Sequence, residues 1–223
     1  MNIRLAYNFD LDLFQKLFPG TQLFDWDRDG NEKIDLLIFP GGEDVSLEYY
    51  LDREMIERFA PLCNSNAERD EKEIRILSMA VGGAINVNKI LGICRGIQLF
   101  GVMFGGSLFP DLNTYGNPHP YMHNIHHKTP SNLDFFKTVN SMHHQGIRNM
   151  GNEFFRLGIS KKSYPKFIAL DGMDAVVEIG TWLNDRILGL QFHPEYYDET
   201  HQDKNKFREF VNSWVSGNTT ILK

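Results

Sequence analysis

The chain has 223 residues, of which 42% are hydrophobic and 23% charged, as is ordinary for a water-soluble globular protein with an adequate core. The formal net charge of −6 offers no basic surface for nucleic acid, and no run approaches the roughly 18 apolar residues of a membrane span. The two cysteines, Cys63 and Cys94, make no disulfide framework, and no signal peptide is evident. We therefore expect a single domain over residues 1–223 in the reducing cytoplasm, with neither nucleic acid nor membrane as a partner.

Strands and helices alternate along the chain, which predicts a doubly wound α/β fold with a largely parallel sheet and helices on both faces. In such a sheet the active site lies beyond the carboxyl ends of the strands. The expected strands cover residues 3–7, 35–39, 88–93, 138–141, 154–159, 166–170, 175–181 and 187–192, with 22–26 as an additional candidate. The expected helices cover residues 10–18, 47–59, 67–79, 97–104 and 207–214.

Two of the expected helices carry recognisable faces. Residues 67–79 place Ile74, Leu77 and Ser78 on one face and mixed charges on the other, so this helix should pack beside the sheet. The C-terminal helix has an apolar stripe that we interpret as core, made of Phe207, Phe210, Val211 and Trp214.

Two short patterns resemble ligand-binding loops but have ordinary structural interpretations. Residues 27–31 resemble the start of a calcium loop, but the remaining ligands, including a closing Glu, are missing, so we expect a turn. Residues 81–84 resemble a phosphate loop but lack its Lys-Ser/Thr ending, so a helix end followed by a turn explains them better.

The most informative segment runs from Leu91 to Gln98 and places one cysteine between two glycines at the end of an apolar strand. Gly92 and Gly96 allow a sharp turn and a close approach of strand and helix, so the pattern predicts that Cys94 is presented at a strand-to-helix turn. The N–H groups and the dipole of the new helix would favour the reactive thiolate. The alternative is a buried structural cysteine beside a helix.

A second motif near the C-terminus supplies the other groups that a thiolate catalyst needs. His193-Pro194-Glu195 follows the strand expected over residues 187–192. His193 would accept the thiol proton and later deliver it to a leaving amine, and Glu195 would hold the imidazole in the correct tautomer. Taken alone, the tripeptide is a loop with a solvated carboxylate; together with Cys94 it predicts a catalytic Cys-His-Glu triad.

These motifs resemble the class I glutamine amidotransferase superfamily, and more closely its peptidase C26-like branch, which includes γ-glutamyl-γ-aminobutyrate hydrolase. The resemblance covers roughly residues 34–197 in the expected order. Its further motifs are the glycine loop over residues 39–45 followed by Tyr49 or Tyr50, Arg69-Asp70 with Glu73, residues 105–112, and Val-Asn-Ser-Met-His-His-Gln over residues 139–145.

The resemblance implies the flavodoxin-like fold of this superfamily and an oxyanion hole at the nucleophile. The backbone N–H of Arg95 and that of Gly41 or Gly42 would stabilise the oxyanion, and which glycine donates stays open. The Arg95 side chain would either steer a substrate carboxylate or lie at the surface. Asp44 is expected to cap the helix that follows the glycine loop.

The resemblance also implies substrate-binding residues. Gln98 would help to bind the glutamyl moiety, and Ser141, His143 and His144 would line the pocket. A second catalytic histidine at position 143 or 144 is an alternative, as is a simple hydrogen bond of this pair to the backbone.

The segment between Asp111 and Thr138 departs from the rest in being rich in Asn, Pro and His. Imidazoles suit zinc, but no cysteine or consistent acidic partner accompanies them, and Pro118 and Pro120 oppose a helix that would align them. We interpret the segment as a mobile loop over the active-site rim. The identity of the leaving group is therefore left open. The histidines are His119, His123, His126 and His127.

Together these residues predict an enzyme that hydrolyses a γ-glutamyl amide through a Cys94 thioester and releases glutamate and an amine. The hypothesis requires no cofactor and no metal. The alternative is a glutaminase subunit that delivers ammonia to a separate synthetase partner, and a homo-oligomer is also open. A non-catalytic binding module is a third possibility, against which the intact triad argues. The amine and the pathway cannot be read from the sequence.

Overall fold

The computed structural model describes residues 1–114, 121–149, 151–152, 154–160 and 176–223. Among these residues the main sheet has nine strands, in the order β2-β1-β3-β4-β11-β10-β9-β6-β7, and β5 pairs with β8 separately. The strands of the main sheet are β1 (Ile3–Leu5), β2 (Gln22–Leu23), β3 (Ile34–Phe39), β4 (Val87–Ile93), β6 (Met122–His127), β7 (Thr138–Asn140), β9 (Phe154–Ser160), β10 (Val177–Trp182) and β11 (Ile187–Leu190). The separate pair is β5 (Ser107–Phe109) and β8 (Gly146–Asn149).

The sheet is parallel in one half and antiparallel in the other. Neighbouring strands from β2 through β1, β3 and β4 to β11 are parallel, as alternating strands and helices predict. From β10 onward each neighbour runs antiparallel. The predicted largely parallel α/β sheet is therefore confirmed, with an antiparallel extension beyond β11.

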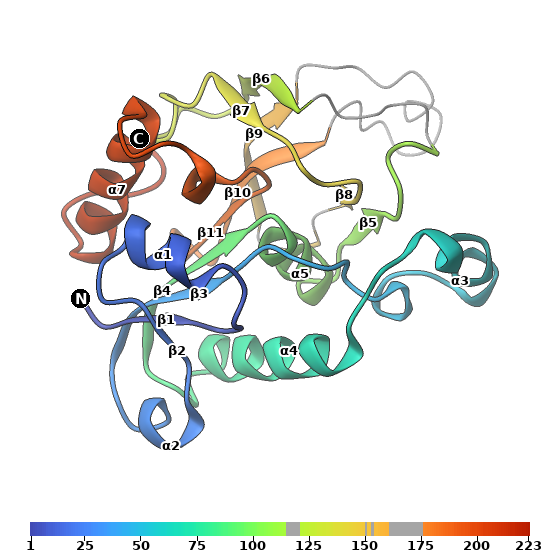
Figure 1. Ribbon diagram of the computed structural model, residues 1–223, viewed down its shortest axis with the longest axis horizontal. Helices are drawn as coiled ribbons and strands as arrows, with labels where there is room; N and C mark the ends of the chain where they lie inside the picture. The colour runs from blue at the N-terminus through green and yellow to red at the C-terminus, as the bar shows by residue number, and fades with distance from the viewer. Residues whose placement is uncertain (115–120, 150, 153, 161–175) are drawn as a thin grey trace.

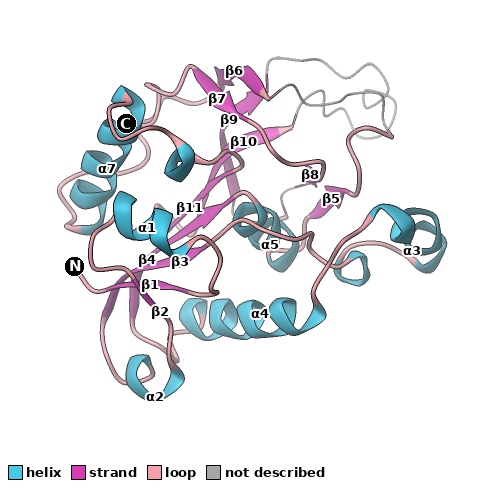
Figure 2. Ribbon diagram, viewed as in Figure 1, coloured by secondary structure: helices cyan, strands magenta, loops and turns pink. Residues whose placement is uncertain are grey.

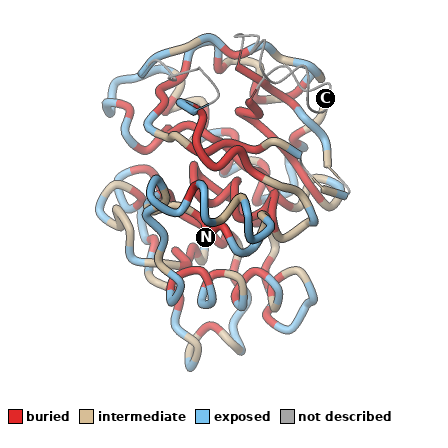
Figure 3. The backbone as a smooth tube through the Cα atoms, turned by 90° about the vertical axis from the view of Figure 1, so that its right-hand side faces the viewer, coloured by how far each residue is buried: buried red, intermediate tan, exposed pale blue. Residues whose placement is uncertain are grey.

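Helices cover both faces of the sheet, as Figure 1 shows. On one face α1 (Leu11–Leu17) and α7 (Gln202–Val215) pack against the sheet, and the C-terminal apolar stripe is buried there as expected. On the other face α4 (Ala67–Val81) and α5 (Arg95–Met103) form a second apolar cluster with the strands. Two cores thus enclose the central strands, and Figure 3 shows the buried segments running through the middle of the molecule.

The region expected as one helix over residues 47–59 is broken into two. It consists of a 3₁₀ turn, η1 (Leu47–Tyr49), and a separate helix, α3 (Arg53–Phe59), followed by η2 (Ala60–Leu62). The break has a local cause, because the Asp52 carboxylate accepts a hydrogen bond from the Met55 N–H at 3.0 Å and so begins α3 as an N-cap.

Other expectations differ in detail. The turn expected over residues 27–31 overlaps a short helix, α2 (Trp26–Asp29), which the Asp25 carboxylate caps. As expected, α4 ends at Val81 and a turn follows. The strand expected over residues 166–170 lies outside the described residues.

The histidine-rich segment expected as a mobile loop contains a strand instead. β6 pairs with β9 on one side and β7 on the other, which Figure 2 displays at the top of the sheet. Alternate residues face inward, with Ile125 buried and His126 exposed, so the pattern has the period of a half-buried strand. Within the described residues, no helix is both long and apolar enough to cross a bilayer.

Replacing Gly96 with alanine should destabilise this fold. A Cβ there would overlap the main-chain carbonyl of Phe39 at the end of β3, and backbone cannot rotate away as a side chain does. Overpacking of this kind costs about 1–3 kcal/mol, so we expect the free energy of unfolding, measured by urea denaturation, to fall by about that amount.

Gly101→Ala in the same helix is the matched control. Its Cβ would meet only side-chain atoms of Ile147, the nearest at 3.3 Å. We expect its free energy of unfolding to stay within about 1 kcal/mol of the wild type. Equal losses in the two variants would contradict the role of the β3–α5 contact.

Candidate active site

Cys94 lies at the junction of β4 and α5, where its backbone is strained. Its φ of 51° and ψ of −101° fall in a region that residues other than glycine rarely adopt. The Cys94 N–H donates to the Leu190 carbonyl at 2.7 Å, which ties the turn to β11. The sharp strand-to-helix turn predicted from the sequence is present.

His193 and Glu195 emerge beside this turn. β11 runs parallel to β4, and the last residues of the two strands are paired. The segments that follow the two strands therefore leave the sheet at the same edge. His193 Nδ1 lies 2.7 Å from Glu195 Oε1, and both side chains are buried. A Cβ built on Gly41 would lie 2.7 Å from His193 Cε1 and 3.5 Å from Cys94 Cβ. The chains that follow β3, β4 and β11 therefore converge on one point.

The negatively charged groups around His193 raise the pKa of its imidazole. Burial alone would lower the pKa of His193, but the negative charges of a Cys94 thiolate and of Glu195, with the hydrogen bonds to both, raise that pKa well above its usual value. The imidazole therefore holds its proton more strongly than a free histidine does.

Asn140 fixes the main chain of His193. Its Oδ1 accepts from the His193 N–H at 2.8 Å, and its Nδ2 donates to the His193 carbonyl at 2.8 Å. Asn140 lies in the motif over residues 139–145, but nothing in the sequence indicates this role for it. The residues next to Asn140 in the sequence do not indicate a hydrogen-bond partner 53 residues away in the chain.

The Arg95 side chain is buried at the turn between β4 and α5, which we call the elbow, so both expectations for it, at the surface or on a substrate carboxylate, are wrong. It is 1% exposed and pairs with Asp70 and Glu73 of α4. Arg69 of the same helix pairs with Glu73 at 3.3 Å and with Glu43 of the glycine loop. We call these five residues the α4 ion cluster.

The ion cluster gives α4 a buried face that its sequence pattern does not indicate. In the first turns the buried residues are charged, and only further along are they Ile76, Leu77 and Ala80. Ser78, expected on the packed face, is exposed. The one sign in the sequence is the presence of opposite charges at positions 69, 70 and 73, but a charged helix face is ordinarily solvated.

Comparison with known proteins assigns the chain to a family. A family model described as peptidase C26 matches residues 27–195. The chain belongs to the peptidase C26 family. A provisionally named glutamine amidotransferase-like protein, YvdE, from Lactococcus lactis is 32% identical over 92% of this chain and 87% of that protein.

Solved structures share the fold at low sequence identity. A provisionally assigned GMP synthase component from Thermoplasma acidophilum has a TM-score of 0.62 at 19% identity and covers 96% of this chain and 94% of that one. A glutamine amidotransferase from Thermotoga maritima has a TM-score of 0.55 at 14% identity and covers 96% and 84%. The resemblance and the fold predicted from the sequence are confirmed.

In this member of the peptidase C26 family, Gln98 is buried against the segment over residues 139–145. Its Nε2 donates to the Gln145 carbonyl at 3.1 Å and to Gln191 Oε1 at 3.3 Å. Ser141 is buried nearby, and His143 Nδ1 donates to the same Gln145 carbonyl at 2.7 Å. Burial lowers the pKa of His143 to about 4, so its ring is neutral near neutral pH. The substrate-binding roles of these residues stay predictions.

His144 lies between two carboxylates. Its Nε2 is 2.9 Å from Asp44 Oδ1, and its Nδ1 is 3.3 Å from Asp111 Oδ1. Asp44 also accepts from the Asn64 N–H at 2.9 Å, so it braces the loop and does not cap the next turn as expected. The hydrogen bond that His144 donates to Asp44 raises the pKa of His144, against the opposing effect of burial.

The described histidines of β6 do not converge. His123 Nε2 lies 2.9 Å from Glu178 Oε1, His127 Nε2 donates to the Phe136 carbonyl at 2.6 Å, and His126 is exposed. His119 lies outside the described residues. Within the part of the chain that the structure describes, no three His, Cys, Asp or Glu side chains form a group that could hold a metal ion.

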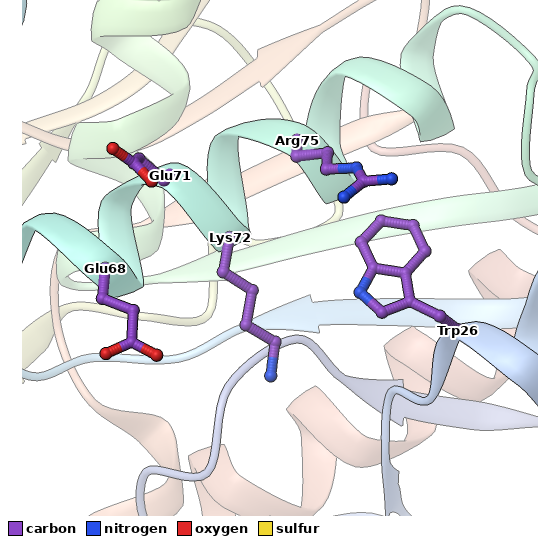
Figure 4. A pocket seen from close by; sticks show the side chains of 5 residues that line it. All are labelled: Trp26, Glu68, Glu71, Lys72 and Arg75. Atoms are coloured by element: carbon purple, nitrogen blue, oxygen red, sulfur yellow. The ribbon is translucent and has the colours of Figure 1, made fainter.

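A separate pocket lies on the outer face of α4, shown in Figure 4. Arg75 stacks there over the Trp26 ring at 4.6 Å. The other lining residues are Glu68, Glu71 and Lys72. None of the predicted site residues lies in this pocket.

Replacing Glu195 with glutamine should lower the pKa of His193. The substitution removes one of the two negative charges that favour the imidazolium, while the amide oxygen can still accept from Nδ1. We would follow the His193 Cε1–H signal by NMR as a function of pH. Glu199→Gln, a nearby exposed carboxylate, is the control, and an unchanged titration in Glu195→Gln would contradict the assignment.

Replacing His144 with glutamine should weaken the fold more in acid than in base. Because the folded-state pKa of His144 is raised, its stabilising contribution is complete below about pH 6.5 and disappears as pH rises through that raised value. We expect the loss in unfolding free energy to be larger at about pH 6 than at about pH 9. The exposed His126→Gln variant should show no such difference; a pH-independent loss in His144→Gln would count against the charged pair.

Proposed function

We propose that this chain hydrolyses a γ-glutamyl amide bond, with Cys94 as nucleophile, and releases glutamate and an amine. The observation that carries the proposal is the convergence of Cys94 and His193 on Gly41, with His193 Nδ1 2.7 Å from Glu195 Oε1. Nucleophile, base and orienting group follow the logic of covalent catalysis. Membership of the peptidase C26 family supports this chemistry.

The reaction has two halves. In the first, the Cys94 Sγ attacks the γ-carbonyl carbon, and the negative charge that forms on oxygen is stabilised by the N–H of Arg95 and of a loop glycine. His193 gives its proton to the leaving nitrogen as the C–N bond breaks, which leaves a γ-glutamyl thioester. In the second half, His193 takes a proton from water, the hydroxyl adds to the thioester carbon, and the C–S bond breaks to release glutamate.

A glutaminase subunit that passes ammonia to a separate synthetase would use the same residues. The structural similarity to a provisionally assigned component of a GMP synthase favours keeping this alternative. The two proposals differ in the leaving group and in the need for a partner. They separate in an assay of the purified chain alone.

The test is glutamate release by the purified protein with L-glutamine and a panel of γ-glutamyl amines. We expect rapid hydrolysis of one conjugate over glutamine, and a loss of at least about a thousandfold in kcat for Cys94→Ala. Cys63→Ala, which removes the other and half-buried cysteine, should retain full activity.

Each other outcome rejects the stand-alone hydrolase. Turnover of glutamine alone, or a silent panel with a Cys94 that still reacts with a glutamine-analogue alkylator, would indicate a glutaminase that needs its synthetase partner. Full activity in Cys94→Ala would overturn the thioester mechanism. An unreactive Cys94 would indicate a non-catalytic binding module.

A further inference from the structure

Arg69 holds the glycine loop from the side opposite the nucleophile. Its side chain is fully buried, and its Nη2 donates to the Gly41 carbonyl at 2.7 Å and to the Pro40 carbonyl at 3.3 Å. The same guanidinium is fixed by Glu43 and Glu73 and lies over the Tyr7 ring at 4.4 Å. These contacts surround the Arg69 guanidinium on several sides and hold it in one position.

The bond to Gly41 sets the direction of the next N–H. In a trans peptide the carbonyl and the following N–H point in opposite directions, and the described peptide bonds are all trans. Because the Gly41 carbonyl points to Arg69, the Gly42 N–H points away from it. His193 and Cys94 border the same loop, since a Cβ built on Gly41 would lie 2.7 Å from His193 Cε1 and 3.5 Å from Cys94 Cβ. Among the described residues no group accepts a hydrogen bond from the Gly42 N–H.

The conformation of Gly42 agrees with this arrangement. Its φ of +132° is a backbone angle that residues with a side chain rarely adopt, and a Cβ there would overlap the Arg69 guanidinium. Glycine therefore lets the loop lie directly on the arginine, while the residue itself remains exposed on its other side.

The same stretch of α4 also holds the second expected donor. The Arg95 side chain pairs with Asp70 and Glu73, and its backbone N–H follows Cys94 at the elbow. Glu73 thus contacts both arginines. The glycine loop and the elbow are therefore anchored to one face of α4.

We propose that Arg69 is a positioning residue that holds the Gly41–Gly42 peptide so that the Gly42 N–H, together with that of Arg95, forms the oxyanion hole. This inference rests on the proposed acyl-transfer chemistry at Cys94. It assigns the donor to Gly42 rather than Gly41, and it makes the hole a preformed feature of the chain.

The test compares two reactions of Cys94 that differ in their need for an oxyanion hole. With p-nitrophenyl acetate, the thiolate forms a C–S bond to the carbonyl carbon, the C–O bond breaks, and p-nitrophenolate leaves after negative charge has formed on the carbonyl oxygen. With iodoacetamide, the thiolate displaces iodide and no such charge forms. The p-nitrophenolate burst and the alkylation rate are each measured against Cys94→Ala.

Arg69→Lys is the main variant, because lysine keeps the charge but loses the forked donors that bind the loop carbonyls. We expect its acylation rate to fall by about tenfold to a hundredfold, since loss of an oxyanion donor costs about a hundredfold or more. Its alkylation rate should stay within about twofold, because the pair of Cys94 with His193 is untouched. Arg75→Lys, on the exposed face of the same helix, should change neither rate.

A second variant changes the glycine-loop side of the contact with Arg69. Gly42→Ala forces the loop and the guanidinium apart, so it should show the same selective loss of acylation even if Arg69→Lys folds poorly. A thermal melt of each variant identifies general unfolding. Equal losses of acylation and alkylation in folded variants, or no loss of either, would overturn the positioning role.

Neither reagent carries a glutamyl group, so this result is separate from that of the γ-glutamyl panel. A silent panel with a selective loss of acylation would reject the proposed substrate and keep the positioning role. Hydrolysis of a γ-glutamyl amide together with full acylation in both variants would keep the proposed substrate and reject the positioning role of Arg69.

Discussion

The burial of the α4 ion cluster is the constraint on which the arrangement of the site depends. Arg69 and Arg95 cannot remain charged away from water unless carboxylates meet them, and Asp70 and Glu73 meet them from one helix face. Removing one partner of a buried pair costs about 3–5 kcal/mol, whereas replacing the whole group with apolar residues often costs nothing. The cluster is therefore better explained by the positions it imposes than by the stability it adds.

Those positions matter because three neighbouring parallel strands end together. The loop after β3 carries Gly41, the turn after β4 carries Cys94, and the segment after β11 carries His193. Apolar clusters on both faces of the sheet hold the strands themselves. The ion cluster and the Asn140 amide then fix the irregular segments beyond the strand ends, where regular backbone hydrogen bonds no longer do so.

The buried strands, the elbow and the His-Glu pair could be predicted from the sequence because their signals are local. Apolar runs and glycine spacing report on a few adjacent residues, and those residues do form β4, α5 and β11. The contacts that orient the site are not local. Arg69 meets Gly41 across 28 residues and Asn140 meets His193 across 53, and each partner taken alone looks like an ordinary polar residue.

The features that the sequence does not predict share one physical cause. A charged helix face is normally solvated, so the burial of Arg95 against Asp70 could not be inferred without knowing that the start of α5 lies beside α4. The histidine-rich segment has the composition of a loop, yet two neighbouring strands offer it hydrogen bonds and it forms β6. In both cases tertiary partners overruled the local pattern.

The parallel pairing of β4 with β11 determines when the candidate site assembles while the chain is synthesised and folds. During synthesis Cys94 leaves the ribosome well before His193, because β5 to β10 lie between them in the sequence. Until β11 takes its place, the thiol has no imidazole beside it and no carboxylate to orient that imidazole. A partly made chain thus carries Cys94 without these two partners, and the three side chains come together only when β11 pairs with β4.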